Sequence, residues 1–273
     1  MFDIENLTSG DISVNGLKIH YYRTGGDKPA LVLLHGITDS GQCWPRMVQH
    51  LGDDFDMVMV DARGHGLSDA PDRGYGFQEQ AGDVVGVVEA LKLHRPVLVG
   101  HSMGAMTAIG VAACSPGLIS ALILEDPPLS TQEQIPVEET RSWMEEARIR
   151  IRRERGQALS ELVANRRVES PNWSEDELIP WAEAKQQVIP DVADIAFSLQ
   201  LPWRSSFRRI DCPILLLTAD HSAGALITPE IADEAASLWS DGRVVNIQDA
   251  GHNIRRDQFK NYLAAVSGFL AAV

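Results

Sequence analysis

The chain has 273 residues, which is enough for one sizeable domain with a large buried core, or for one domain that carries an insertion. Asp and Glu number 38 against 24 Lys and Arg, giving a formal net charge of −14. This excess argues against non-specific binding to nucleic acid or to anionic lipid, because both need a basic face. The apolar fraction of 44% and the charged fraction of 23% are typical of a globular protein and argue against extensive disorder.

Apolar runs alternate with helical patterns along most of the chain. Asn15-Gly16 predicts a hairpin between the alternating segments Ile12–Val14 and Leu17–Tyr22. Runs rich in Val, Ile and Leu, typical of strands covered on both faces, follow at Ala30–Leu34, Met57–Val60, Val97–Val99, Ala121–Leu124 and Ile214–Leu217. A further short strand is predicted at Val244–Ile247. Helices are predicted at Phe77–Leu91, Met103–Cys114, Pro229–Trp239 and Arg256–Ala272. The alternation predicts an α/β fold with a mostly parallel central sheet flanked by helices.

The alternation stops between Ser130 and about Arg209, where no strand-like run occurs. Helices are predicted there at Val137–Arg155, Gln157–Arg167, Ser174–Gln187 and Asp191–Leu199. So long a helical insertion between two sheet strands indicates a cap over one edge of the sheet. We therefore expect a core of residues 1–129 and 210–273 and a helical cap of residues 130–209.

The segment from Gly100 to Gly104 reads Gly-His-Ser-Met-Gly and joins a predicted buried strand to a predicted helix. This is the G-x-S-x-G pattern in the strand–turn–helix context that gives it meaning. The two glycines leave room for a sharp turn, on which the central Ser102 would project its hydroxyl at the carboxyl edge of the sheet. Ser102 is therefore the candidate nucleophile.

A serine hydroxyl needs a base within hydrogen-bond reach before it can act as a nucleophile. His252 lies in a predicted loop between the last strand and the last helix, and this loop can deliver an imidazole to the same sheet edge. His101 is next to the candidate nucleophile but should point elsewhere on a tight turn. His35 and His65 fall in other loops at this edge and could line the site.

Taken together, these segments resemble the α/β-hydrolase superfamily over nearly the whole chain outside the cap. The matching pieces are Leu33–Ile37, Asp61–Asp69, Gly100–Gly104, Leu122–Asp126 and Gly251-His252. The resemblance implies an α/β-hydrolase fold and an oxyanion hole formed by the backbone N–H groups of Ile37 and Met103. Each such donor typically contributes ~3 kcal/mol to the transition state.

The third member of the expected Ser-His-acid triad departs from the common family pattern. Many members carry the acid in a Gly-x-x-Asp turn after the strand that follows the cap, but here Ala219 and Ser222 occupy those two places. A subset of the superfamily, including haloalkane dehalogenase-like and zearalenone lactonase-like enzymes, takes the acid from the preceding strand, about 24 residues after the nucleophile. The resemblance then implies Asp126 as the acid that orients the histidine, with Asp220 and then Glu125 as alternatives.

Three other groups of residues receive a structural interpretation or an open one. Asp61, Arg63 and Asp69 are expected to organise the loops by hydrogen bonds and ion pairs. The basic run of the cap is interpreted as a solvated helix face balanced by neighbouring glutamates; it comprises Arg148, Arg150, Arg152, Arg153 and Arg155. Five tryptophans could line an apolar pocket or simply pack the cap: Trp44, Trp143, Trp173, Trp181 and Trp203.

These residues predict a serine hydrolase that cleaves a carboxylic ester or a lactone through an acyl-enzyme. A C–C bond hydrolase or a cofactor-free perhydrolase would use the same triad, and a non-catalytic ligand-binding member of the fold is a third hypothesis. The dehalogenase and epoxide hydrolase reactions are disfavoured, since the resemblance implies an Asp nucleophile for them where Ser102 stands. The substrate and the oligomeric state do not follow from the sequence.

The remaining sequence features bear on location and cofactors. Cys43, Cys114 and Cys212 are widely spaced and form neither a metal-binding nor a disulfide pattern, which fits a reducing compartment. The N-terminus lacks the pattern of a secretory signal, and the uncharged stretch Pro96–Leu124 divides into strand, turn, helix and strand instead of one membrane span. We expect a cytoplasmic enzyme for a small-molecule substrate, with no metal, organic cofactor, nucleic-acid partner or membrane association.

Overall fold

A computed structural model describes residues 1–129, 136–198 and 202–273 of the chain. Its eight strands are β1 (Thr8–Val14), β2 (Leu17–Arg23), β3 (Ala30–Leu34), β4 (Asp56–Val60), β5 (Val97–His101), β6 (Ala121–Glu125), β7 (Ile214–Ala219) and β8 (Gly242–Ile247). They form one sheet in the order β1-β2-β4-β3-β5-β6-β7-β8, in which β1 and β2 are antiparallel and the strands from β4 to β8 are parallel. The predicted α/β class with a mostly parallel sheet is therefore confirmed.

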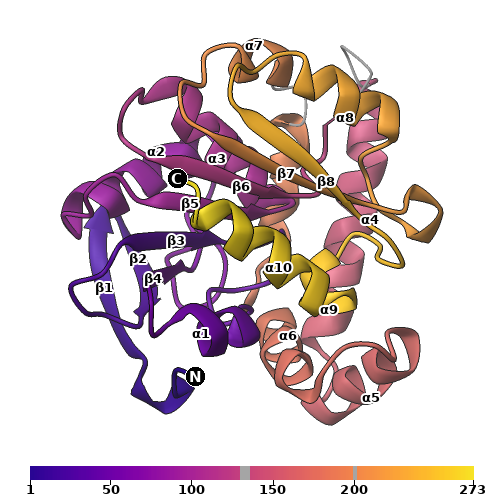
Figure 1. The fold of residues 1–273 in the computed structure, drawn as a ribbon. Coiled ribbons are helices and arrows are strands. Elements are labelled where there is room, and N and C mark those ends of the chain that lie inside the picture. The colour runs from indigo at the N-terminus through magenta and orange to yellow at the C-terminus, as the bar shows by residue number, and fades with distance from the viewer. Residues whose placement is uncertain (130–135, 199–201) are drawn as a thin grey trace.

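Helices cover both faces of this sheet (Figure 1). The helices outside the insertion are α1 (Pro45–Leu51), α2 (Phe77–Ala90), α3 (Met103–Cys114), α8 (Pro229–Ala236), α9 (Ile254–Asp257) and α10 (Phe259–Leu270), with 3-10 turns at Ile4–Asn6 and His221–Ala223. Successive strand residues alternate between two hydrophobic clusters. Val32 and Leu34 belong to the cluster that contains α2 and α3, whereas Leu31 and Leu33 belong to the cluster that contains α1 and α10.

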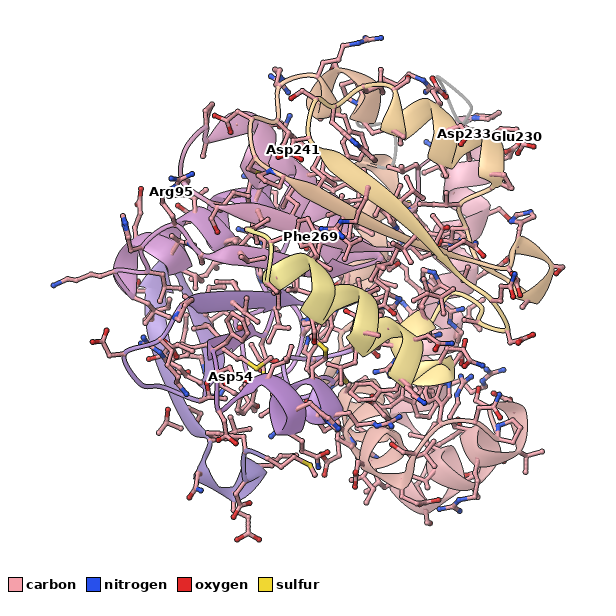
Figure 2. The ribbon with its side chains drawn as sticks, in the orientation of Figure 1. Asp54, Arg95, Glu230, Asp233, Asp241 and Phe269 are labelled. Carbon is pink, nitrogen blue, oxygen red and sulfur yellow. The ribbon has the colours of Figure 1, made fainter. Side chains whose placement is uncertain are left out.

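The polar exterior contrasts with this core. Asp54, Arg95, Glu230 and Asp233, labelled in Figure 2, are all exposed, and the picture places Glu230 and Asp233 at the edge of the molecule near α8. Phe269 of α10 is buried in the cluster that contains α1 and α10. None of the helices in the three described ranges is long and apolar enough to cross a membrane.

A helical insertion separates β6 from β7, as the sequence predicts. It contains α4 (Val137–Arg155), α5 (Leu159–Glu169), α6 (Glu175–Gln187), the 3-10 helix η2 (Pro190–Ser198) and α7 (Trp203–Phe207). No strand occurs in residues 136–198 or 202–209. Figure 1 shows α4, α5 and α6 gathered at one side of the sheet. The predicted cap boundary at Ser130 and the predicted helix end at Leu199 lie outside the described residues.

The last predicted helix differs from the observed structure. The sequence predicts one helix over Arg256–Ala272, but the structure has a short helix from Ile254 and a second one from Phe259. The break falls at Gln258, whose backbone is neither helical nor extended, with φ −134° and ψ 56°. The helical sequence pattern contains no proline or glycine at this point, so it does not reveal the break.

Candidate active site

The backbone at Ser102 makes the sharp turn that the sequence predicts. Ser102 has φ 51° and ψ −113°, an unusual conformation for a non-glycine residue, between the end of β5 and the start of α3. A Cβ atom at Gly100 would lie 2.5 Å from the Ala105 backbone nitrogen, and one at Gly104 would lie 2.0 Å from the Leu34 carbonyl oxygen. Glycine is therefore required at both positions, because only its missing side chain allows the turn to pack against the sheet.

His252 is held by a buried carboxylate. Its Nδ1 lies 2.6 Å from Oδ2 of Asp126, whose side chain is completely buried. The same carboxylate accepts backbone hydrogen bonds from Leu226 and Ile227, at 2.8 and 3.1 Å. Since a carboxylate accepts, Nδ1 is the donor, and this arrangement leaves the Nε2 lone pair of His252 free to take a proton.

The two alternative acids have other partners. Oδ2 of Asp220 accepts a hydrogen bond from the Asp249 amide at 2.8 Å. Glu125 forms a buried ion pair with Arg255, in which Nη1 and Oε2 are 3.1 Å apart. In the three described ranges, Asp126 is the carboxylate that pairs with His252.

The loop after β3 has its carbonyl groups occupied by hydrogen bonds. The Gly36 carbonyl accepts from the Asp39 amide at 3.0 Å, and the Ile37 carbonyl lies 2.6 Å from Nε2 of His65. Nζ of Lys185 donates to the Thr38 carbonyl at 2.6 Å. The described part of the chain offers no acceptor to the amide N–H of Ile37 or to that of Met103, which opens α3. Both amides are thus available to a bound oxyanion.

A cavity of about 520 Å³ brings these elements together, a volume within the usual range for small-molecule sites. Ser102, His252, Ile37 and Met103 all line it. The described residues contain no group of three or more His, Cys, Asp or Glu side chains arranged to hold a metal ion.

In the comparison with protein-family models, residues 31–264 match the alpha/beta hydrolase family. The chain belongs to the alpha/beta hydrolase family. It is 32% identical to N-formylmaleamate deformylase of Pseudomonas putida strain KT2440, over 97% of each chain. It is 26% identical to 2-(acetamidomethylene)succinate hydrolase of Mesorhizobium japonicum, over 92% of this chain and 91% of the other. The family match confirms the resemblance inferred from the motifs, and hydrolysis is the class of activity that it supports.

Solved structures agree with this alpha/beta hydrolase assignment. The crystal structure of N-formylmaleamic acid deformylase from Pseudomonas putida S16 matches with a TM-score of 0.80 and 28% identity, covering 95% of this chain and all of the other. The enol-lactonase from Burkholderia xenovorans LB400 matches with a TM-score of 0.74 at 24% identity, covering 96% of this chain and all of the other, which shows the shared fold. The predicted fold is therefore confirmed at the level of the family.

The other candidate histidines of this alpha/beta hydrolase have structural contacts. Nε2 of His101 donates to the His252 carbonyl at 2.9 Å, so this residue supports the loop that carries His252. Nδ1 of His35 donates to the Gly36 carbonyl at 2.8 Å, and burial with the nearby His65 lowers the pKa of His35 to about 3. Asp61 accepts hydrogen bonds from the amides of Gly41 and Leu67, which agrees with the prediction that it organises the loops.

Three of the five candidate tryptophans line the cavity: Trp143, Trp173 and Trp181. Trp203 packs instead against Phe207, in the hydrophobic cluster that contains α2 and α3. Trp44 lines a separate cavity of about 330 Å³ beside α1 and α6.

A buried charge network lies beside the loops that carry Ile37 and His252 in this alpha/beta hydrolase. Asp39 forms ion pairs with Lys185, Arg255 and Arg256 at 3.1 to 3.4 Å. Burial raises the pKa of the Asp39 carboxyl, but these three cations outweigh burial and hold the pKa well below its usual value. Glu177 of α6 pairs in turn with Arg256 at 3.1 Å. The network therefore connects the Ile37 loop, the helical insertion and the segment that follows His252.

Sequence reasoning did not identify the cationic lining of the cavity. The interpretation of Arg150 as part of a solvated helix face is incomplete, because Arg150 is exposed but also lines the cavity. Arg166, Lys185 and Arg256 line it as well. No sequence motif marks these residues as cavity residues. Which face of each helix points into the cavity depends on how the insertion packs against the core.

Proposed function

We propose that the protein is a serine hydrolase that transfers an acyl group from a small ester or amide to water, with Ser102, His252 and Asp126 as its triad. The observation that carries the proposal is the 2.6 Å contact of His252 Nδ1 with the buried Asp126, combined with Ser102 and His252 lining one cavity. A base oriented in this way beside a serine on a strained turn is the arrangement that acyl-enzyme chemistry needs.

The chemistry would run in two halves. His252 Nε2 takes the Ser102 proton while Oγ attacks the substrate carbonyl, and the amides of Ile37 and Met103 donate to the resulting oxyanion. His252 then protonates the leaving oxygen or nitrogen, which departs and leaves Ser102 acylated. Water, activated by the same imidazole, releases the acid and restores the serine.

The choice between ester and amide concerns only the leaving atom in this scheme. The sequence favours an ester or a lactone, whereas the relative at 32% identity is named as a deformylase of N-formylmaleamate, an amide. The amine of an amide leaves only when its nitrogen is protonated. His252, held by Asp126, can supply that proton as a general acid. We therefore propose that the substrate range includes N-acyl amides as well as esters.

We also propose that residues 130–209 act as a cap over the active site. Helices α4, α5 and α6 contribute Trp143, Arg166 and Trp181 to the cavity that contains Ser102. A wall of this kind excludes water and selects the substrate, while the core supplies the triad.

Replacing the nucleophile tests the proposal directly. Ser102→Ala should abolish turnover of p-nitrophenyl acetate and of N-formylmaleamate, and should prevent labelling by a fluorophosphonate probe. Ser115→Ala is the matched control, because Ser115 lies just beyond the other end of α3. Labelling or turnover that survives Ser102→Ala would overturn the assignment, and a wild-type protein that never reacts with the probe would favour a non-catalytic ligand-binding protein.

A further inference from the structure

The cavity has a different charge balance from the rest of the molecule. The chain carries a formal net charge of −14, yet four cationic and two anionic side chains line this cavity. They are Arg150, Arg166, Lys185, Arg256, Asp39 and Glu154. A local excess of positive charge in an acidic protein attracts anions to the cavity.

Part of this charge is already neutralised inside the protein. Lys185 and Arg256 both pair with Asp39, and Arg256 also pairs with Glu177. These side chains are between 1% and 6% exposed, so they hold one another and the loops in place. Arg150, Arg166 and Glu154, all from the helical insertion, remain to face a ligand.

Arg166 on α5 has a hydrogen-bond donor without a partner among the described residues. Its side chain is 26% exposed, and the ion pair found for it among the described residues joins Nη1 at 3.3 Å to Glu169, which is 61% exposed. Nε of Arg166 is buried and has no hydrogen-bond partner among the described residues. An exposed ion pair contributes little, whereas a buried donor without a partner is costly, so an acceptor supplied by a ligand would be strongly favoured.

Two tryptophans surround the guanidinium of Arg166. Its central carbon lies 4.4 Å from the ring centroid of Trp181 and 5.2 Å from that of Trp173. Burial lowers the pKa of Arg166, although nearby Glu169 and Glu154 raise it, and an arginine remains charged throughout. Both distances are within the range of cation–π attraction, and a guanidinium held in this way can still donate two parallel hydrogen bonds to a planar carboxylate.

We propose that Arg166, supported by Arg150, forms a carboxylate-binding subsite, and that the substrate is an ester or amide that carries a free carboxylate away from the scissile bond. The proposal rests on the proposed acyl hydrolase function, because the subsite and Ser102 line the same cavity. Arg150 on α4 adds a second positive charge, and no ion pair is found for it within the described ranges. The carboxylate would orient the substrate, and the two tryptophans would pack against its apolar part.

A pair of substrates measures this preference. We expect the wild-type protein to hydrolyse p-nitrophenyl hemisuccinate with a kcat/KM above that of the neutral p-nitrophenyl butyrate. Arg166→Gln should reduce the ratio of the two kcat/KM values by about 10- to 100-fold, mainly through KM for the anionic ester. Arg167→Gln is the matched control, since the adjacent Arg167 is 52% exposed and pairs with Glu175 outside the cavity.

A binding experiment separates failure of the subsite from failure of the catalytic proposal. Binding of succinate to the Ser102→Ala protein can be measured by titration calorimetry, which needs no turnover. Binding should be lost in the Ser102→Ala/Arg166→Gln double variant. Succinate binding that is equal in the two proteins, or absent from both, would overturn the carboxylate subsite. A ratio of kcat/KM values that Arg166→Gln and Arg167→Gln change equally would overturn it as well. A wild-type protein that hydrolyses neither ester, while Ser102→Ala still binds succinate through Arg166, would count against the acyl hydrolase function alone.

Discussion

At the scale of single residues, Asp126 illustrates how burial and hydrogen-bond donors fix a carboxylate beside a histidine. Its side chain is fully buried, and its oxygens receive two backbone N–H groups in addition to Nδ1 of His252. The backbone hydrogen bonds fix the carboxylate, and the carboxylate in turn fixes the tautomer and the orientation of the imidazole. Asp126, whose φ is 43°, directly follows β6, and Ser102 directly follows β5, the strand paired with β6.

Replacing this carboxylate by an amide keeps the shape but changes the tautomer. We expect Asp126→Asn to lower kcat for p-nitrophenyl acetate by about 10⁴-fold, because Asn can donate to Nδ1 and so leave the proton on the wrong ring nitrogen. Steady-state kinetics check this, and Asp220→Asn serves as the control, because Asp220 binds the Asp249 amide instead of His252. If Asp220→Asn were the variant that lost activity, Asp126 would not be the triad acid.

At the scale of secondary-structure elements, sequence patterns located most of the molecule. The bounds of α3 and α4 were predicted to the residue, since each has a distinct pattern with clear ends, and the strands were displaced by only a few residues at their ends. The short helix α1 was not predicted, because seven residues are too few to show a helical period. Arg150 and Arg166 were not predicted as cavity residues, since no local pattern states which helix face meets the core.

Helix α6 connects the insertion to the loop that carries the Ile37 amide. Nζ of Lys185 is 2.6 Å from the Thr38 carbonyl and 2.7 Å from the Thr38 hydroxyl, and its side chain is 4% exposed. The carbonyl is therefore held by the insertion at a point one residue beyond the proposed oxyanion donor. Lys185 is a positioning residue in this arrangement.

Removing this cation should disturb the oxyanion hole more than substrate binding. We expect Lys185→Met to lower kcat by about tenfold or more with a smaller change in KM, because the Ile37 amide is needed most in the transition state. Lys185→Arg, which keeps a charged donor, should recover part of the lost kcat. Lys260→Met on the exposed side of α10 is the control, and a Lys185→Met protein that changes only in KM would contradict this positioning function.

At the scale of the whole molecule, the fold places its ionisable groups unevenly. Most charged side chains are exposed, among them Asp241, which is labelled in Figure 2, whereas several polar groups are buried. Among these groups are three histidines, His35, His65 and His101, which are between 1% and 3% exposed. Burial lowers the pKa of each, to about 3 for His35 and well below the usual value for His101.

These three histidines should make the fold sensitive to mild acid. In the unfolded chain a histidine binds its proton below about pH 6.5, whereas the folded protein keeps these side chains neutral at lower pH. The unfolded state therefore binds more protons in this window, and each histidine lowers the free energy of unfolding by up to about 1.4 kcal/mol per pH unit as the pH falls from about 6.5 toward its folded pKa.

Urea denaturation between pH 7.5 and pH 5 should show this loss of stability. His101→Gln should reduce the pH dependence, while His94→Gln, at an exposed position, should leave it unchanged. A stability that stays constant over this range would show that the buried histidines are not neutral in the folded protein.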